Sequence, residues 1–115
     1  MEYIIIAALV ILFFVWRLKP AKGVATISTE QLKQQLSQKD KMFIDVRTPS
    51  EYKRQHIAQF ANIPLGSDLS NLPKDKEIVV ICQSGMRSSQ ACKQLKKLGY
   101  AKVTNVRGGM SAWRG

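Results

Sequence analysis

Apolar residues are concentrated at the amino terminus of the chain, where residues 3–16 read YIIIAALVILFFVW without a charged or strongly polar side chain. A helix of this length spans about 21 Å, and its flanks extend it towards the roughly 30 Å of a membrane's hydrocarbon core. The segment after the run is basic, with Arg17, Lys19 and Lys22. By the positive-inside rule this flank faces the cytoplasm. The pattern predicts a single transmembrane helix within residues 1–19, with the N-terminus outside the cell and the rest of the chain in the cytoplasm.

A cleaved signal peptide and a buried core helix are the two other interpretations of this run. A signal peptide has a basic start and small residues at its cleavage site. Here Glu2 precedes the run, and its end is bulky, with Phe13, Phe14, Val15 and Trp16. A buried core helix should show polar residues on one face, and this run has none. A membrane anchor is therefore favoured, with Pro20 ending the helix and residues 20–23 forming a linker.

From residue 24 onward, short apolar runs alternate with segments of helical periodicity. Strands are expected over 24–27, 42–46, 61–65, 78–81 and 103–106. Helices are expected over 28–37, 49–55, 88–98 and from 108 onward, with one further helical turn at 68–72. Capping-box patterns mark the first two helix starts. The alternation predicts an α/β domain over residues 24–115, in which a mostly parallel sheet is flanked by helices on both faces.

Composition allows one small domain after the apolar segment. The chain has 115 residues, of which 45% are hydrophobic and 23% charged, a mix that excludes a disordered tail. Its 18 Lys and Arg against 8 Asp and Glu give a net charge of +10, which suits a polyanionic neighbour. A basic cluster around the predicted helix 88–98 is either a solvated face or a contact with anionic lipid; it comprises Lys93, Lys96, Lys97 and Lys102. Nucleic acid is not expected as a partner, because no aromatic-rich basic motif accompanies the charge.

The candidate chemistry follows the most apolar predicted strand, where Cys82 comes directly after Ile78-Val79-Val80-Ile81. In open parallel sheets, functional residues gather at the carboxyl ends of strands. Backbone N–H groups of the next residues can form an anion-binding nest, over Gln83, Ser84, Gly85, Met86 and Arg87. Arg87 and a helix N-terminus add positive charge, so the thiolate and a negatively charged persulfide are both favoured. The alternative for Cys82 is a small, buried apolar side chain.

Several further motifs run along the domain: Ile44-Asp45-Val46-Arg47 with Glu51, His56-Ile57, Asn62-Ile63-Pro64-Leu65, and Val106-Arg107-Gly108-Gly109-Met110 with Ala112-Trp113. Together with the loop from Cys82 to Arg87, their order and spacing resemble the single-domain rhodaneses, which are sulfurtransferases. The resemblance covers residues 24–113 and implies a rhodanese-like parallel sheet flanked by helices. It also implies a persulfide on Cys82, a small-molecule sulfur donor of the thiosulfate or persulfide type, and a thiol or other nucleophile as acceptor. No metal or organic cofactor is implied.

The loop length separates sulfur transfer from its closest rival. Cys82 to Arg87 spans six residues, which in the resembled family goes with sulfur transfer, whereas related phosphatases have one residue more. A non-catalytic binding module, a phosphatase or arsenate reductase, and a dithiol redox protein remain as alternatives. Gln83 stands where many family members have arginine. This difference removes one cation from the loop mouth and argues against high activity with a dianionic donor such as thiosulfate.

The remaining candidate residues have mainly structural interpretations. Asp45 and Arg47 are expected to buttress the loop mouth, and Arg47 has the i,i+4 spacing to pair with Glu51. His56, the only histidine, is expected to be a packed or hydrogen-bonded residue. Cys92 is expected to pack within its helix, and the predicted cytoplasmic placement argues against a disulfide with Cys82. One histidine and two separated cysteines do not make a zinc site.

Overall fold

The computed structural model describes residues 5–10 and 23–115 of the chain. Residues 5–10 form a short helix with exposed side chains. Within these two ranges, no helix has the length and apolar character needed to cross a membrane. Most of the anchor predicted over residues 1–19, and all but the last residue of the linker at 20–23, lie outside the described residues.

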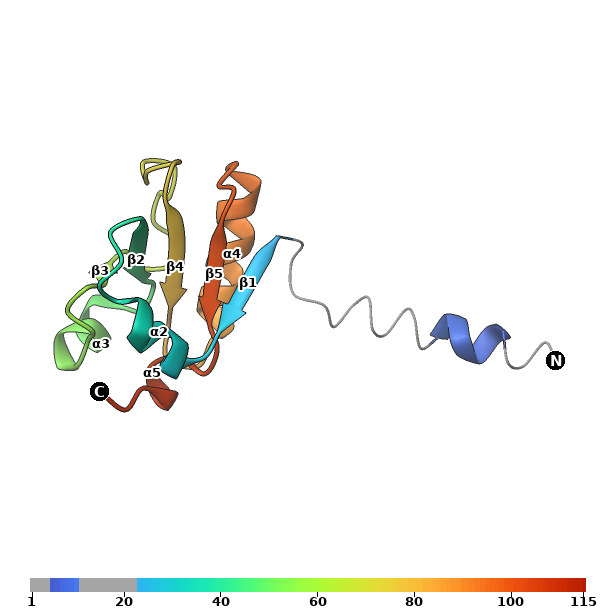
Figure 1. The fold of residues 1–115 in the computed structure, drawn as a ribbon, viewed down its shortest axis with the longest axis horizontal. Helices are drawn as coiled ribbons and strands as arrows, with labels where there is room; N and C mark the ends of the chain where they lie inside the picture. Colours follow the sequence, from blue (N-terminus) through green and yellow to red (C-terminus); the bar gives the residue numbers. More distant parts are fainter. Residues whose placement is uncertain (1–4, 11–22) are drawn as a thin grey trace.

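One sheet of five strands forms the centre of the domain (Figure 1): β1 (Val24–Ile27), β2 (Lys41–Asp45), β3 (Ala61–Asn62), β4 (Glu77–Ile81) and β5 (Val103–Val106). The strand order is β1-β5-β4-β2-β3, and all neighbouring strands are parallel. The predicted α/β class is therefore confirmed. Because the strands are parallel, their carboxyl ends lie at one edge of the sheet, and the central strand β4 delivers Cys82 to that edge.

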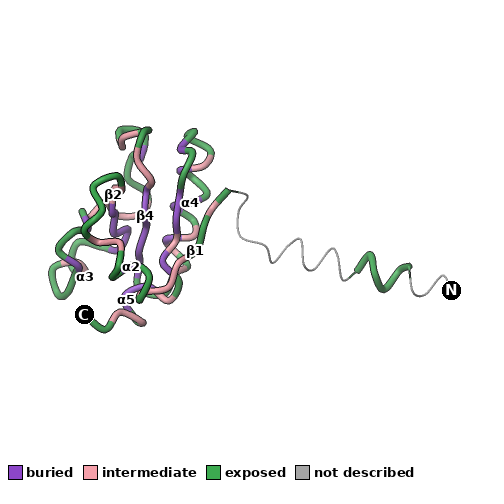
Figure 2. The backbone as a smooth tube through the Cα atoms, viewed as in Figure 1, coloured by how far each residue is buried: buried purple, intermediate pink, exposed green. Residues whose placement is uncertain are grey.

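Strand β4 is buried throughout its apolar length because helices cover both faces of the sheet (Figure 2). Its side chains point alternately to the two faces. On one face they join a cluster with α4 (Met86–Lys97), which contributes Ala91, Cys92 and Leu95. On the other face they join α2 (Thr29–Gln35) and α5 (Gly109–Ala112), which contribute Leu32 and Met110. Each fully buried Val, Ile or Leu stabilises the fold by about 1.5–3 kcal/mol, so this central strand is a rigid base for the loop that follows it.

Both predicted capping boxes are present. The Ser28 hydroxyl accepts the Gln31 N–H at 3.2 Å while the Gln31 side chain accepts the Ser28 N–H at 2.9 Å, and α2 starts there. Thr48 and Glu51 exchange the equivalent bonds at the start of α3 (Pro49–Arg54). These local bonds satisfy N–H groups that have no partner inside the helix.

The helical turn predicted at 68–72 is wrong. The Asp68 carboxylate accepts the N–H and the hydroxyl of Ser70 at 2.9 and 2.6 Å, and this local bonding competes with a helix. The Tyr100 hydroxyl also donates to the carbonyls of Leu69 and Leu72, each at 2.8 Å, which holds the segment in an irregular turn.

Several element boundaries also differ from the prediction, among them those of β3 and α4. Strand β3 ends at Asn62 rather than at residue 65, although the N–H groups of Ile63 and Leu65 still donate to the carbonyls of Asp45 and Val46, at 2.9 and 3.0 Å. Helix α4 begins at Met86 rather than Ser88, because Gly85 already serves as its N-cap. Met86 and Arg87 therefore belong to the first turn of the helix, and the irregular loop consists of residues 82–85.

Candidate active site

Cys82 follows β4 directly, and its side chain is buried in the apolar cluster beneath α4. The chain then turns to Gly85, whose φ of +104° lies in the left-handed region that favours glycine. In this conformation the Gly85 N–H points at the Cys82 Sγ atom at a distance of 3.0 Å. The turn thus supplies a backbone donor to the sulfur.

Ser88, in the first turns of α4, supplies a side-chain donor. Its hydroxyl lies 3.3 Å from Cys82 Sγ and 2.6 Å from Oδ1 of Asn105 on β5. A hydroxyl has one proton, so the two acceptors compete for it. Neither Ser88 nor Asn105 was predicted from the sequence. Ser88 directly follows the predicted loop at a helix start, a signal that could have identified it; Asn105 carries no such local signal.

The pKa of the Cys82 thiol is lowered from its ordinary value. The largest single influence is burial, which raises the pKa, but hydrogen bonds to the sulfur together outweigh it. The Ser88 hydroxyl contributes most, followed by the backbone N–H groups of Ser88, Gly85 and Ser84. The thiolate is the nucleophilic form of cysteine. Hydrogen bonding to the sulfur therefore offsets the effect of burial and favours the thiolate over the thiol.

The carboxyl-terminal motif supports the loop from beneath. The N–H groups of Met110 and Ser111 donate to the carbonyls of Cys82 and Gln83, both at 2.9 Å. The Ser111 hydroxyl also donates to the Gln83 carbonyl at 2.7 Å. A Cβ on Gly109 would lie 2.1 Å from the Cys82 carbonyl oxygen, so only glycine fits there. Ser111 was not predicted as part of the site, because its contact with the loop depends on the tertiary fold.

The Arg87 guanidinium forms an ion pair with a carboxylate. Its two terminal nitrogens donate to the two carboxylate oxygens of Glu51, at 2.7 and 2.9 Å. The hydrogen bond from Arg87 is the main reason that the pKa of Glu51 is lowered to about 2, and the same bond raises the pKa of Arg87. The negative charge of Cys82 raises the pKa of Arg87 only to a smaller extent. Arg87 was expected to favour the loop anion, and its ion pair with Glu51 was not predicted from the sequence.

Asp45 and Arg47 form a buried ion pair where β2 ends. Nη2 of Arg47 lies 2.9 Å from an oxygen of Asp45, and Nε donates to both carboxylate oxygens at 3.1 Å. Nη1 reaches the side-chain oxygen of Gln83 at 3.3 Å, so the pair extends to the loop mouth. The predicted pairing of Arg47 with Glu51 is wrong, because Asp45 takes the Arg47 guanidinium and Glu51 pairs with Arg87.

The predicted loop residues differ in their exposure. Gln83 and Ser84 are exposed, and Met86 is 76% exposed, which is unusual for a large apolar side chain. Gly85 and Arg87 are half-buried. Three of the five residues in the predicted nest are thus exposed, while Cys82 is buried.

Cys92 and His56 lie outside the reactive centre. Cys92 is buried in α4, and burial, followed by the Cys82 charge, raises its pKa to about 12, so it stays protonated at neutral pH. Both cysteines are free thiols. His56 stacks on Tyr52 with ring centroids 3.9 Å apart, and its Nδ1 lies 2.8 Å from the Tyr52 carbonyl oxygen.

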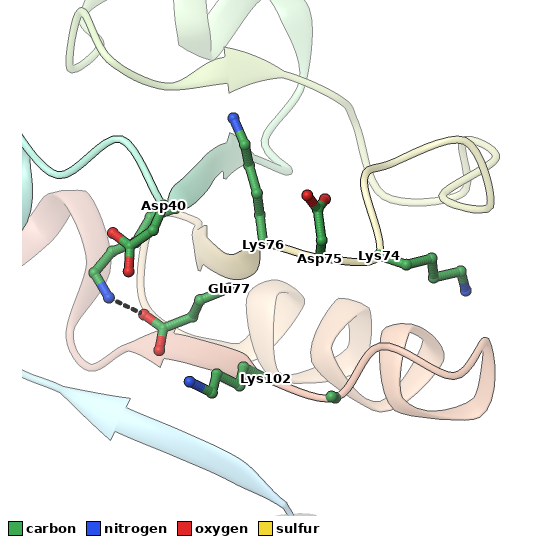
Figure 3. Close-up of a pocket in the computed structure, with 8 residues that line it drawn as sticks. Asp40, Lys74, Asp75, Lys76, Glu77 and Lys102 are labelled. Carbon is green, nitrogen blue, oxygen red and sulfur yellow. Dashed lines mark hydrogen bonds and ion pairs between the residues drawn. The ribbon is translucent and has the colours of Figure 1, made fainter.

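Two surface hollows lie at opposite edges of the sheet. A hollow of about 480 Å³ adjoins the Cys82 loop and is lined by Arg47, Glu51, Arg54, Gln55 and Gln83. The other hollow, of about 220 Å³, is lined by Asp40, Lys41, Lys74, Asp75, Lys76, Glu77, Ala101 and Lys102. The dashed line to Glu77 in Figure 3 marks the ion pair that Lys41 forms with it. Glu77 begins β4, whereas Cys82 follows its end, so this second hollow is remote from the thiol.

Comparison with known proteins identifies relatives across the whole domain. The family model described as "Rhodanese-like domain" matches residues 28–115. The chain is 40% identical over 91 residues to a protein of Allochromatium vinosum named "Sulfurtransferase", covering 76% of this chain and 85% of that protein. It is 43% identical over 93 residues to "Putative sulfurtransferase YtwF" of Bacillus subtilis, covering 77% of this chain and 89% of that protein.

The fold also matches solved structures. The crystal structure of a rhodanese-like domain protein from Staphylococcus aureus aligns with a TM-score of 0.71 and 31% sequence identity. The alignment covers 78% of this chain and 91% of that one.

Proposed function

The chain belongs to the rhodanese-like domain family, and we propose that it is a sulfurtransferase that carries sulfane sulfur as a persulfide on Cys82. The observation that most supports this function is the convergence of two donors, the Gly85 N–H and the Ser88 hydroxyl, on one buried sulfur. Relatives named as sulfurtransferases agree with it.

The proposed reaction has two half-reactions, each of which conserves charge. In the first, the Cys82 thiolate attacks the outer sulfur of a donor RS–S⁻. A sulfur–sulfur bond to Cys82 forms, the donor's sulfur–sulfur bond breaks, and RS⁻ leaves. In the second, an acceptor thiolate or cyanide attacks the outer sulfur, and the Cys82 thiolate is restored. Sulfur moves as a neutral atom, so neither an oxidant nor a reductant is consumed.

The proposed persulfide is held by the residues that already hold the thiolate. The loop N–H groups face the anion, and the exposed Gln83, Ser84 and Met86 lie where the donor and the acceptor approach. We assign Arg87 to shaping the loop through Glu51, and the pair of Asp45 and Arg47 to holding Gln83. The proposed cycle requires no metal or organic cofactor.

Membrane attachment is a separate part of the proposal. We propose that residues 1–19 anchor the protein in the cell membrane, that residues 20–23 form a linker, and that residues 24–115 are the catalytic domain in the cytoplasm. The uncharged run 3–16 and the basic flank after it support this arrangement.

The test is the intact mass of the full chain, kept in mild detergent, after exposure to thiosulfate or an organic persulfide. We expect Cys82 to gain one sulfur atom, and cyanide to remove it as thiocyanate. Cys82→Ser should abolish both signals, whereas Cys92→Ser should retain most of the activity because the Cys92 thiol is protonated and buried.

Several outcomes would contradict the proposal. Equal thiocyanate formation by the wild type and Cys82→Ser would place the reaction elsewhere. A chain that takes no sulfur from any donor would instead support a non-catalytic binding module, and phosphate release from aryl phosphates or reduction of arsenate would support those rival activities.

A further inference from the structure

The hollow beside the Cys82 loop is larger than a small inorganic donor requires. Its volume of about 480 Å³ lies within the range of sites that bind organic ligands, roughly 300–1,000 Å³. Gln83, the residue directly after the nucleophile, forms part of its lining. Because Gln83 follows Cys82 directly in the chain, a ligand in this hollow lies beside the loop that carries the nucleophile.

The charged side chains that line the hollow differ in whether they are paired with an opposite charge. The Arg47 guanidinium is bound by Asp45 at 2.9 Å, and Glu51 is bound by Arg87 at 2.7 Å. Arg54, in the last turn of α3, is exposed and takes part in no ion pair among residues 5–10 and 23–115. The hollow thus keeps one cation available for a ligand anion.

Polar groups in the same lining add hydrogen-bonding capacity. The Gln83 amide is held between Arg47 and Ser111, at 3.3 and 3.2 Å, so its position is fixed before a ligand arrives. The exposed Gln55 supplies a second amide. A guanidinium with nearby amides suits a carboxylate on a small polar organic molecule.

We propose that this hollow binds the carboxylate of a low-molecular-weight organic persulfide, and that Arg54 is the residue that recognises it. The inference rests on the proposed sulfurtransferase function and names the side chain that recognises its donor. With the carboxylate on Arg54, the outer sulfur of the donor is attacked by the Cys82 thiolate, the donor's sulfur–sulfur bond breaks, and a carboxylated thiolate leaves. Arg54 positions the donor and takes no part in bond exchange.

The experiment compares two donors that differ by a single group. N-acetylcysteine persulfide carries a carboxylate, and N-acetylcysteamine persulfide lacks it but is otherwise the same. The rate of sulfur loading onto Cys82 is measured on the full chain by mass spectrometry as a function of donor concentration. Arg54→Gln should raise KM for the carboxylated donor by about fivefold, the upper end for an exposed ion pair, and leave kcat unchanged.

Controls separate this effect from general charge loss. Loading by N-acetylcysteamine persulfide should be the same in Arg54→Gln and in the wild type. Lys53→Gln removes the same charge one position earlier from an exposed side chain outside the hollow, and should leave KM for both donors unchanged. Arg54→Lys should lie between wild type and Arg54→Gln, because it keeps the charge but loses the planar fork.

The outcomes distinguish this inference from the function on which it rests. If neither donor loads Cys82 in the wild type, the sulfurtransferase function itself fails. If both donors load Cys82 but Arg54→Gln and Lys53→Gln have the same KM for the carboxylated donor, the assignment of Arg54 is overturned.

Discussion

At the scale of single residues, the reactivity of Cys82 depends on direct hydrogen bonds more than on a neighbouring cation. Burial disfavours the thiolate, yet the pKa of Cys82 is lowered because Ser88 and the loop N–H groups donate to it. Arg87, in the first turn of α4, is paired with Glu51. Charge-assisted hydrogen bonds act at contact distance, whereas a partly exposed, already paired charge is screened.

Ser88 is therefore expected to control the ionisation of the nucleophile. Ser88→Ala removes the strongest of the bonds that lower the pKa of Cys82, so the pKa should rise. A hydrogen bond to a charged group contributes about 1.5 kcal/mol or more, which corresponds to roughly tenfold slower alkylation of Cys82 at neutral pH. The difference should shrink as pH rises, because bulk deprotonation then restores the thiolate.

The measurement is the pH dependence of iodoacetamide alkylation at Cys82. Ser89→Ala is the matched control, since it removes a hydroxyl from the next residue of α4 without touching the bonds to the sulfur. Superimposable profiles for Ser88→Ala and the wild type would show that the backbone donors alone set the pKa of Cys82.

At the scale of elements, the start of α5 is expected to be as sensitive as the loop itself. Gly109→Ala would place a Cβ 2.1 Å from the Cys82 carbonyl oxygen, and backbone cannot yield as a flexible side chain can. We expect a loss of about 3 kcal/mol or more in the free energy of unfolding, together with loss of sulfur transfer. Urea denaturation and thiocyanate formation measure the two effects.

Gly66→Ala provides the matched control for that substitution. Gly66 also has a positive φ, +97°, but an added Cβ would meet nothing within 4 Å. The free energy of unfolding of this variant should fall only by the conformational cost of the left-handed backbone, about 1–2 kcal/mol, and its activity should be kept. Equal destabilisation in the two variants would mean that backbone strain, rather than the contact with Cys82, explains the requirement for glycine at 109.

Local sequence signals predicted the elements that local bonds create. The capping boxes at Ser28 and Thr48 form as expected, and the alternation of apolar runs with helical segments gave the parallel α/β class. The segment 68–72 escaped prediction because Tyr100, far away in sequence, fixes its carbonyls. A capping box involves residues that lie within four positions of one another, whereas the contact of Tyr100 with segment 68–72 forms only when the sheet is assembled.

The candidate site likewise combines features that the local sequence predicts with features that depend on the tertiary fold. Cys82 was predictable because it ends the most apolar strand, and the loop because Gly85 follows at a short distance. The pairing of Glu51 with Arg87 joins residues 36 apart in sequence, so the nearer partner Arg47 was preferred to Arg87. The bonds from Met110 and Ser111 to the loop likewise follow only from the packing of α5 beneath β4.

At the scale of the whole molecule, the edge of the sheet where the strands begin differs from the edge where they end. The strands are parallel, so Val24 at the start of β1 pairs with Val103 at the start of β5, at the edge opposite Cys82. Lys102 is exposed beside that start, and Lys96 lies against Gly23. The polypeptide therefore enters the domain among basic side chains, and the loop that covers Cys82 lies at the other edge.

This polarity leads to a prediction about orientation at the membrane. If residues 1–19 are the proposed anchor, the lysine-rich edge faces the anionic lipid surface and the Cys82 loop faces the cytoplasm. The full chain should then sediment with membranes. A membrane-impermeant maleimide should label Cys82 in inside-out vesicles but not in intact cells, because the proposed topology places the domain on the cytoplasmic side. Cys92 should contribute little signal, since its pKa is about 12 and its thiol stays protonated near neutral pH. Cys82→Ser supplies the background, and labelling of Cys82 in intact cells would reverse the proposed topology.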